Sequence, residues 1–256
     1  MMIDRDVISS AMYEAMRLAA TQLPPDVDAA LVAALEAESD PLARRHIEVS
    51  LENARAAAEG YLRPTMVDPL TRANPGDNIG PGMPRVLLSF EGDGDGLEIT
   101  AAPKGGGSEI FGTFYRMMYP SDGEAGILSF VLDAIREGCY AGKICPPAIV
   151  GVGIGGTADL CMALAKEAAV LRPIGVANPD PNVAALERKL FDAARNLGIG
   201  AMGAAGTSAV MAVNVETAVT HTAALPVAVN AQCLVGRRWR ASISASGDVS
   251  FTGDPA

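Results

Sequence analysis

The segment ICPPAIVGVGIGG, residues 144–156, restricts the possible folds more than any other part of the chain. Ala148–Val152 is a short run of small and branched apolar residues, which is typical of a buried strand. The glycines of residues 151–156 predict a tight turn, and the residues that follow predict a helix that continues to about Val170. A strand, a turn and a helix in this order form the basic unit of an α/β fold.

The rest of the chain continues this alternation of helices and strands. We expect an N-terminal helical portion, residues 1–60, and then a mixed α/β domain with Gly-rich loops, residues 61–256, the two forming one compact unit. The helical pattern covers residues 4–59, with a new helix starting at Pro25. Further expected elements are helices at 123–138 and 181–197, a hairpin of Val86–Phe90 with Leu97–Ala101, and strands at 210–215, 226–229 and 241–246.

Composition excludes several classes of protein. The chain has 256 residues, of which 49% are hydrophobic, so it can bury a substantial core. Its formal net charge of −10 argues against a nucleic-acid partner, because binding to phosphates needs clustered Lys and Arg. No uninterrupted apolar run of membrane length occurs, and the N-terminus lacks a secretory pattern. We therefore expect a soluble cytoplasmic protein without a membrane partner.

Gly151, Gly153 and Gly156 spell the G-x-G-x-x-G pattern of dinucleotide-binding loops. That fingerprint also needs an acidic residue about 20 positions later, at the end of a second strand. Here the matching region holds Asp180 between two prolines, where no strand is expected. A close backbone turn that accepts some other anion is the better interpretation.

Several polar side chains are candidates for chemistry, each with a structural alternative. Lys104 precedes three glycines, residues 105–107, whose backbone N–H groups can bind a carboxylate or phosphate; the alternative is a mobile surface loop. Arg72 could hold a carboxylate with two hydrogen bonds, or be an ordinary surface arginine. His221 could act as a general acid or base, or be a partly buried histidine with its hydrogen bonds satisfied.

The four cysteines, Cys139, Cys145, Cys161 and Cys233, are irregularly spaced, which argues against a disulfide framework. They are either buried thiols or ligands of a metal or cluster. Cys145 precedes two prolines, which could present its thiol rigidly, and Cys233 ends the run AVNAQC. Neither has the spacing of a zinc ribbon.

These segments together resemble the α region of the iron–sulfur (class I) fumarases and L-tartrate dehydratases. The resemblance covers roughly residues 61–240 and is highly specific, because the matching runs follow one another in the order of the family. The runs are YLRPTMVDPLTRANPGDN (61–78), PKGGGSE (103–109), ICPPAIVGVGIGG (144–156), LAKEAAVLRPIG (164–175), NLGIGAMG (196–203) and THTAALPVAVNAQC (220–233).

The resemblance implies a [4Fe–4S] cluster held by three cysteines, with one open iron that acts as a Lewis acid on a small dicarboxylate. Two of these cysteines match Cys145 and Cys233, and the active-site histidine of the family matches His221. Arg72 and the Lys104–Gly107 loop match segments that contact the dicarboxylate. The resemblance also implies a separate β subunit as a partner and a homo- or hetero-oligomeric assembly.

The chain departs from the family at one place. The family has a Cys-Gln-Asp-Thr-Gly motif that supplies the first cluster cysteine and an acidic catalytic residue. Here LENARAAAEG runs directly into YLRPTMVDP, and no cysteine precedes Cys139. Cys139 or Cys161 would have to replace the missing ligand, or a partner chain would have to supply it.

Three functions follow as hypotheses. The first is the α subunit of a hydro-lyase that adds or removes water on a dicarboxylate of the fumarate or tartrate type. The second is a related lyase that works without the cluster. The third is a non-catalytic binding or regulatory subunit with the same fold.

Overall fold

The computed structural model describes residues 4–37, 65–74, 81–83, 85–89 and 96–253. The boundary expected near residue 60, together with the helices expected between residues 38 and 59, lies outside the described residues. The helices are α1 (Arg5–Thr21), α2 (Pro25–Ala37), α4 (Gly106–Phe111), α5 (Gly123–Cys139), α6 (Ala158–Val170) and α7 (Pro181–Arg195). The strands are β1 (Leu97–Ala101), β2 (Thr113–Met118), β3 (Ala148–Gly155), β4 (Val210–Ala218), β5 (Leu225–Gln232), β6 (Trp239–Ile243) and β7 (Val249–Thr252).

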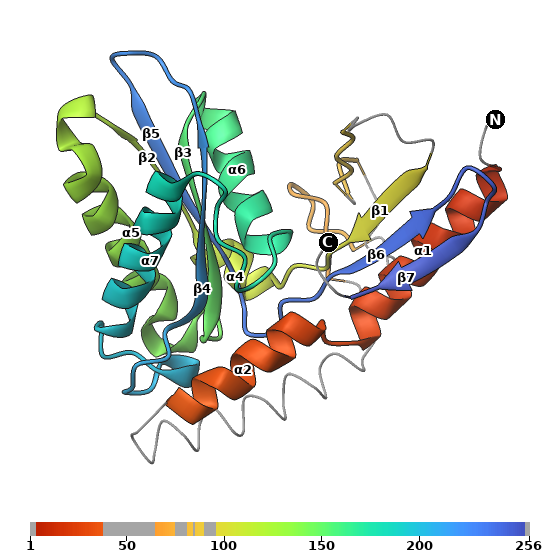
Figure 1. The fold of residues 1–256 in the computed structure, drawn as a ribbon, viewed down its shortest axis with the longest axis horizontal. Helices are drawn as coiled ribbons and strands as arrows, with labels where there is room; N and C mark the ends of the chain where they lie inside the picture. The colour runs from red at the N-terminus through yellow and green to blue at the C-terminus, as the bar shows by residue number, and fades with distance from the viewer. Residues whose placement is uncertain (1–3, 38–64, 75–80, 84, 90–95, 254–256) are drawn as a thin grey trace.

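A mixed four-stranded sheet forms the larger core, with the strand order β2-β5-β3-β4. Strands β3 and β4 are parallel, whereas β5 runs antiparallel to both β3 and β2. Figure 1 shows α6 on one face of this sheet and α5 with α7 on the other. A helix layer on each face explains why β3 is buried along nearly its whole length.

Gly151 and Gly153 allow α6 to lie directly against β3. A Cβ atom on Gly151 would lie 2.0 Å from the carbonyl oxygen of Ala165, and one on Gly153 would lie 2.1 Å from that of Cys161. No side chain of any kind fits in these two places. The alternate residues Val150 and Val152 point to the opposite face and pack in the core that α5 and α7 cover.

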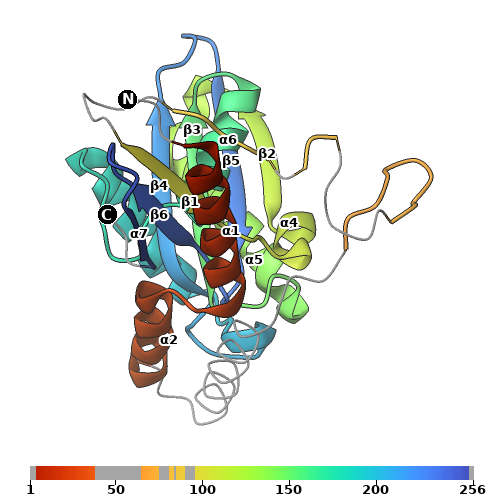
Figure 2. The ribbon, with the colours of Figure 1, turned by 90° about the vertical axis from the view of Figure 1, so that its right-hand side faces the viewer.

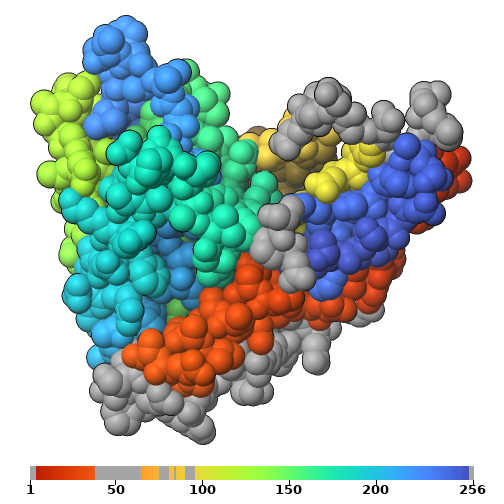
Figure 3. Space-filling view, in the orientation of Figure 1, coloured from red at the N-terminus to blue at the C-terminus, as the bar shows by residue number. Residues whose placement is uncertain are grey.

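A second, three-stranded sheet has the order β1-β6-β7 and is antiparallel throughout. Helix α1 packs on it through Ala11 and Ala15, which meet Ala241 and Ile243. Figure 2 shows α1 lying across this sheet, and the space-filling view in Figure 3 shows a wide notch between the two sheets, with α2 running below it. Asp26 of α2 accepts a hydrogen bond from Arg238, which ties this helix to the segment before β6.

The α/β class is confirmed, and most predicted elements occur with small shifts of their ends. Two predictions were wrong. Residues 151–155 continue strand β3, and the turn is confined to Gly155 and Gly156, both of which have positive φ. The described part of the predicted strand at 86–90 is not in a sheet, and Leu97–Ala101 pairs with β6 instead. Among the residues described, every helix is too short or too polar to cross a bilayer.

The contact between α6 and β3 predicts a large effect of one added methyl group. Gly151→Ala should lower the free energy of unfolding by about 1–3 kcal/mol, because backbone atoms of α6 would have to move. Urea denaturation followed by circular dichroism measures this change. Gly106→Ala is the matched control, since no atom lies within 4 Å of the added methyl group. Equal denaturation midpoints for the two variants would contradict the prediction.

Candidate functional site

Cys145 and Cys233 come together at one end of the mixed sheet. Cys145 precedes β3 and Cys233 follows β5, and these strands are antiparallel, so the two residues lie at the same edge. The carbonyl of Cys145 accepts the N–H of Leu234 at 3.1 Å, and its own N–H donates to Gly142 at 2.9 Å. These bonds hold Cys145 at a φ of 54°, a conformation that is rare for a non-glycine residue. Both thiols are partly exposed.

The Gly-rich segment after Pro103 reaches the same place. A Cβ atom on Gly105 would lie 3.7 Å from the Sγ atom of Cys233. Lys104 Nζ donates to Ser108 Oγ at 3.3 Å and lies 3.1 Å from Glu109 Oε2. Glycines 106 and 107 begin the short helix α4, so the predicted loop is partly helical. The structure therefore brings four sequence candidates, Lys104, Gly105, Cys145 and Cys233, into one site.

A charged triad lies beside the thiols. Glu109 bridges Lys104 and Lys166, whose Nζ atom is 2.6 Å from Glu109 Oε1. Burial lowers the pKa of Lys104, and the Glu109 carboxylate opposes this shift. Burial tends to raise the pKa of Glu109, but the hydrogen bond from Lys166 and the charge of Lys104 outweigh it and hold the pKa below its usual value. The triad carries a net positive charge, which suits an anionic ligand.

The two thiols of this site resist ionisation. Burial raises the pKa of Cys145 and of Cys233, while the cations of Arg237 and Lys104 oppose the shift at Cys233. Both therefore stay protonated at neutral pH until a bound metal or another electrophile displaces the proton.

The other two thiols lie in the core. Cys139, at the end of α5, has no exposed surface, and its Sγ donates to the carbonyl of Ala209 at 3.6 Å. Cys161, in α6, is equally buried, and its Sγ donates to the carbonyl of Gly153 at 3.2 Å. Burial raises the pKa of Cys139 to about 12 and that of Cys161 to about 11.

His221 lies at the opposite end of the sheet from the cysteines. It precedes β5, whereas Cys233 follows β5, so the eight residues of this strand separate them by about 26 Å. The connection that carries His221 projects from the top of the sheet in Figure 1. Its Nδ1 accepts the N–H of Ala223 at 3.1 Å, which leaves Nε2 as the N–H donor of the neutral ring.

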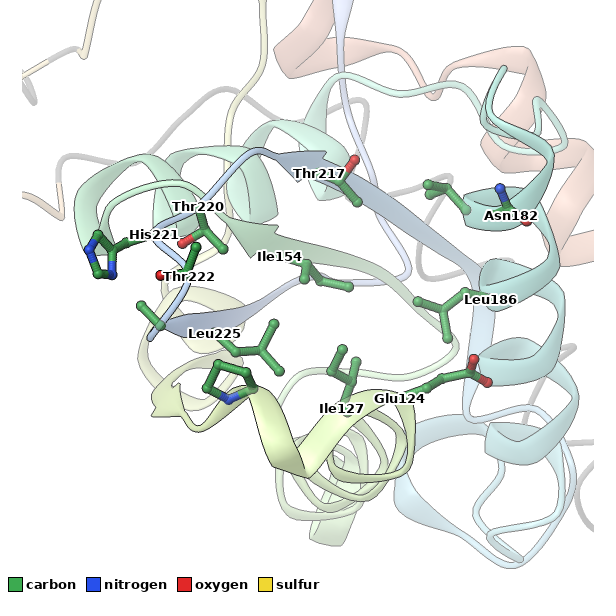
Figure 4. A pocket seen from close by; sticks show the side chains of 14 residues that line it. Glu124, Ile127, Ile154, Asn182, Leu186, Thr217, Thr220, His221, Thr222 and Leu225 are labelled. Atoms are coloured by element: carbon green, nitrogen blue, oxygen red, sulfur yellow. The ribbon is translucent and has the colours of Figure 1, made fainter.

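An open hollow of about 510 Å³ adjoins His221. Figure 4 shows His221 and Thr222 at one end, Asn182 and Glu124 at the other, and apolar side chains between them. The apolar side chains are Pro120, Ile127, Ile154, Val183, Leu186, Ala224 and Leu225.

A buried ion network holds the helix that forms one wall of this hollow. Arg172 pairs with Glu187 of α7 at 2.6 Å and with Glu216 of β4 at 3.2 Å. Its guanidinium also donates to the carbonyls of Val215 and Val176. Arg172, the arginine of the LRPIG run, thus fixes α7 against β4. Its role is to position the helix that forms this wall of the hollow.

Arg72 occupies an exposed turn, with a φ of 62°. The Asp68 carboxylate accepts hydrogen bonds from Leu70 and Thr71, and the N–H of Arg72 donates to the Asp68 carbonyl. Figure 2 shows segment 65–74 as a loop that stands away from the mixed sheet. Within this single chain, Arg72 and His221 are therefore not brought to the cysteines.

Comparison with known proteins places most of the chain in one family. The family model for fumarate hydratase (fumerase) matches residues 54–242, which is most of the chain. The chain belongs to this family.

Its relatives include α subunits. The fumarase-family chain is 37% identical to a putative L(+)-tartrate dehydratase subunit alpha of Methanocaldococcus jannaschii, over 90% of this chain and 95% of that protein. It is 36% identical to the L(+)-tartrate dehydratase subunit alpha of Escherichia coli over 77% of this chain, and 37% identical to that of Shigella sonnei over 72%. The chain spans 63% and 59% of these last two proteins. It is therefore a hydro-lyase subunit of the α type.

The alignment with the Methanocaldococcus protein also reveals a gap. It extends over 276 positions, although 90% of 256 residues is only about 230. About 46 positions of that alignment therefore face a gap in this fumarase-family chain. This agrees with the absence of the Cys-Gln-Asp-Thr-Gly segment.

Sequence reasoning missed the partners of the candidate lysine. Glu109 was visible only as the last residue of PKGGGSE, and Lys166 lies 57 positions later on another helix. Arg237, which adds a second cation near Cys233, follows the matching motif by four residues. No periodicity links these residues, because the fold alone brings them together.

The difference in burial predicts which thiols react. In the native chain at pH 8, Cys145 and Cys233 should react slowly with Ellman's reagent, because they are partly exposed but mostly protonated, whereas Cys139 and Cys161 should react only after unfolding. Cys145→Ser and Cys233→Ser should each remove one reactive thiol. Labelling of Cys139 or Cys161 in the folded chain, detected by peptide mass spectrometry, would contradict the burial described above.

Proposed function

We propose that this chain is the α subunit of a hydro-lyase that adds or removes water on a small dicarboxylate of the fumarate or tartrate type. The observation that carries the proposal is the meeting of Cys145, Cys233, Lys104 and Gly105 at one edge of the mixed sheet. The names of the tartrate dehydratase α subunits support the same substrate class.

The chemistry of dehydration explains this choice of residues. The reaction removes a proton from the carbon next to a carboxylate and a hydroxide from the neighbouring carbon. Lys104 offers its charge to a carboxylate, and the absence of a side chain at Gly105 leaves room beside the Cys233 thiol. A separate β subunit would contribute further cations and close the site from solvent.

The residues present do not fit the three-cysteine cluster that the family resemblance implies. Two thiols meet at the site, and the other two point into the core. We therefore assign no step of the reaction to a cluster held by this chain alone. A lyase reaction without a cluster, or a non-catalytic role, is the alternative that the thiol count favours.

His221 can take part in this reaction from a second copy of the chain. Strand β5 keeps it about 26 Å from Cys233 of the same chain, so one chain does not provide both groups to one substrate. An oligomer in which the loop of one copy reaches the cysteine edge of another would unite them. There the imidazole would act as a proton donor or acceptor.

Activity measurements test the proposed function. The chain, co-expressed with a candidate β subunit, should hydrate fumarate or convert tartrate to oxaloacetate, followed by ultraviolet absorbance. Absence of turnover on every small dicarboxylate tested would refute the catalytic role. Full turnover by an iron-free complex would favour the cluster-free alternative.

Lys104 should matter for substrate binding. Lys104→Met should raise KM for the dicarboxylate about 10–100-fold, because a charge-assisted hydrogen bond is lost. Lys189→Met is the matched control, since Lys189 forms an exposed ion pair with Glu124 far from the thiols. An unchanged KM for Lys104→Met would remove Lys104 from the site.

Mixing of variants tests the contribution of His221 from a second copy. His221→Ala and Cys145→Ser homo-oligomers should each be inactive. Co-expressed as mixed dimers, they should recover about a quarter of the wild-type activity, since half the dimers are mixed and each has one intact site. No recovery in verified mixed dimers would contradict this arrangement.

A further inference from the structure

Two thiolates are too few for the cluster that the family resemblance implies. We infer that this chain does not hold a [4Fe–4S] cluster by itself, because any third ligand beside Cys145 and Cys233 has to come from outside the chain. The inference rests on the proposed function and deepens it, because it states which ligand this chain lacks at the same site.

The cysteine edge has the features of an incomplete site. The Oε1 atom of Gln232 and the Nε atom of Arg237 are buried and have no hydrogen-bond partner in the described part of the chain. Folded proteins satisfy nearly all of their buried polar atoms. The unsatisfied acceptor of Gln232 and the unsatisfied donor of Arg237, both within four residues of Cys233, offer hydrogen-bonding positions to a further group at this edge.

Cys139 cannot complete the site without disrupting the core. Its side chain is fully buried in the cluster that includes Ile135, Ile144 and Val210, and its Sγ faces the carbonyl of Ala209. To reach the Cys145 thiol, the last turn of α5 would have to unwind and leave this core. The loss of so many apolar contacts excludes Cys139 as the third ligand.

Cys161 is on the wrong part of the sheet. It packs with Ala165 and Ala228 between α6 and the sheet, and its Sγ bonds to Gly153, near the end of β3 that adjoins His221. Cys145 precedes the start of this strand. From Ala148, where the strand begins, to Gly153 is about 16 Å of extended chain, and Cys145 lies three residues before Ala148.

The rest of the chain offers no thiol either. The full sequence has only these four cysteines. Among the described residues, no group of three His, Cys, Asp or Glu side chains could hold a metal ion. The alignment gap of about 46 positions shows that the Methanocaldococcus relative has residues with no counterpart here. The third cysteine that the family resemblance implies is therefore not available within this chain.

Transfer of a preformed cluster tests the inference. The full chain, purified without oxygen, is mixed with a [4Fe–4S] cluster carried by 2-mercaptoethanol thiolates. Each cysteine thiol that binds iron gives its proton to the departing small thiolate, so no electron is transferred. Iron and sulfide are then counted after gel filtration, with and without 2-mercaptoethanol in the buffer.

We expect less than about one iron per chain in thiol-free buffer, and about four irons and four sulfides when the small thiol stays present as the missing ligand. Four irons that survive thiol-free gel filtration would overturn the inference. About two irons per chain, as one cluster shared between two copies, would support it, because the cluster would then need ligands from more than one chain. No iron even with the small thiol would exclude this cysteine pair as a cluster site.

Matched variants identify the ligands. Cys145→Ala and Cys233→Ala should abolish the thiol-dependent binding of iron, whereas Cys139→Ala and Cys161→Ala should retain it. Circular dichroism checks that each variant is folded. Loss of iron in Cys139→Ala or Cys161→Ala, with the fold intact, would show that the chain uses a buried thiol and would overturn the inference.

Native mass spectrometry of the protein purified without oxygen from its host gives an independent test. Cluster mass should be absent from the single chain and should occur only on assemblies. Cluster mass on the single chain would contradict the inference. Neither the iron count nor the mass measurement depends on turnover. The proposed function can therefore be refuted in the activity assay without changing the result of this test.

Discussion

The close contact between β3 and α6 is the constraint on which the rest of the structure depends. Because Gly151 and Gly153 have no side chains, the backbone of the helix rests on the backbone of the strand. This contact fixes β3 in the middle of the mixed sheet, between β4 and β5. The ends of β3 and β5 then determine where the functional side chains lie. Gly151 and Gly153 thus serve the packing of the helix on the strand. This explains why the G-x-G-x-x-G pattern occurs here without a dinucleotide-binding turn at these positions.

The two ends of the mixed sheet have different chemical character. One end gathers thiols and cations from segments around residues 104, 145, 166 and 233. The other presents His221 above an apolar hollow with a few polar groups at its rim. Side chains at one end of a strand do not contact those at the other end. A site at either end of the sheet therefore depends on the residues around that end alone. An assembly of several chains is the natural way to bring such ends together.

Much of the fold could be predicted from the sequence, because periodicity and helix signals are local. The helix from residue 123 and the helix from Pro181 occur almost as expected. The glycines of residues 151–155 misled the prediction, since glycine in a strand resembles glycine in a turn until the packing partner is known. The pairing of Leu97–Ala101 with β6 was not predictable either, because its partner lies far along the chain. For the site, the family resemblance named residues but gave no distances, so the separation of His221 from Cys233 became visible only in the fold.

The small three-stranded sheet has a consequence for the synthesis of the protein. Its first strand pairs with a segment about 140 residues later, as Ala101 opposite Trp239 shows. While the ribosome makes the intervening residues, this strand has no neighbour, and the apolar face of α1 has only part of its cover. The nascent chain must keep these surfaces from aggregating until almost all of the described sequence has emerged. The edge strand β2 of the larger sheet waits in the same way for β5, since Thr113 lies opposite Asn230, 117 residues later, so both sheets are completed only when the last third of the chain has been made.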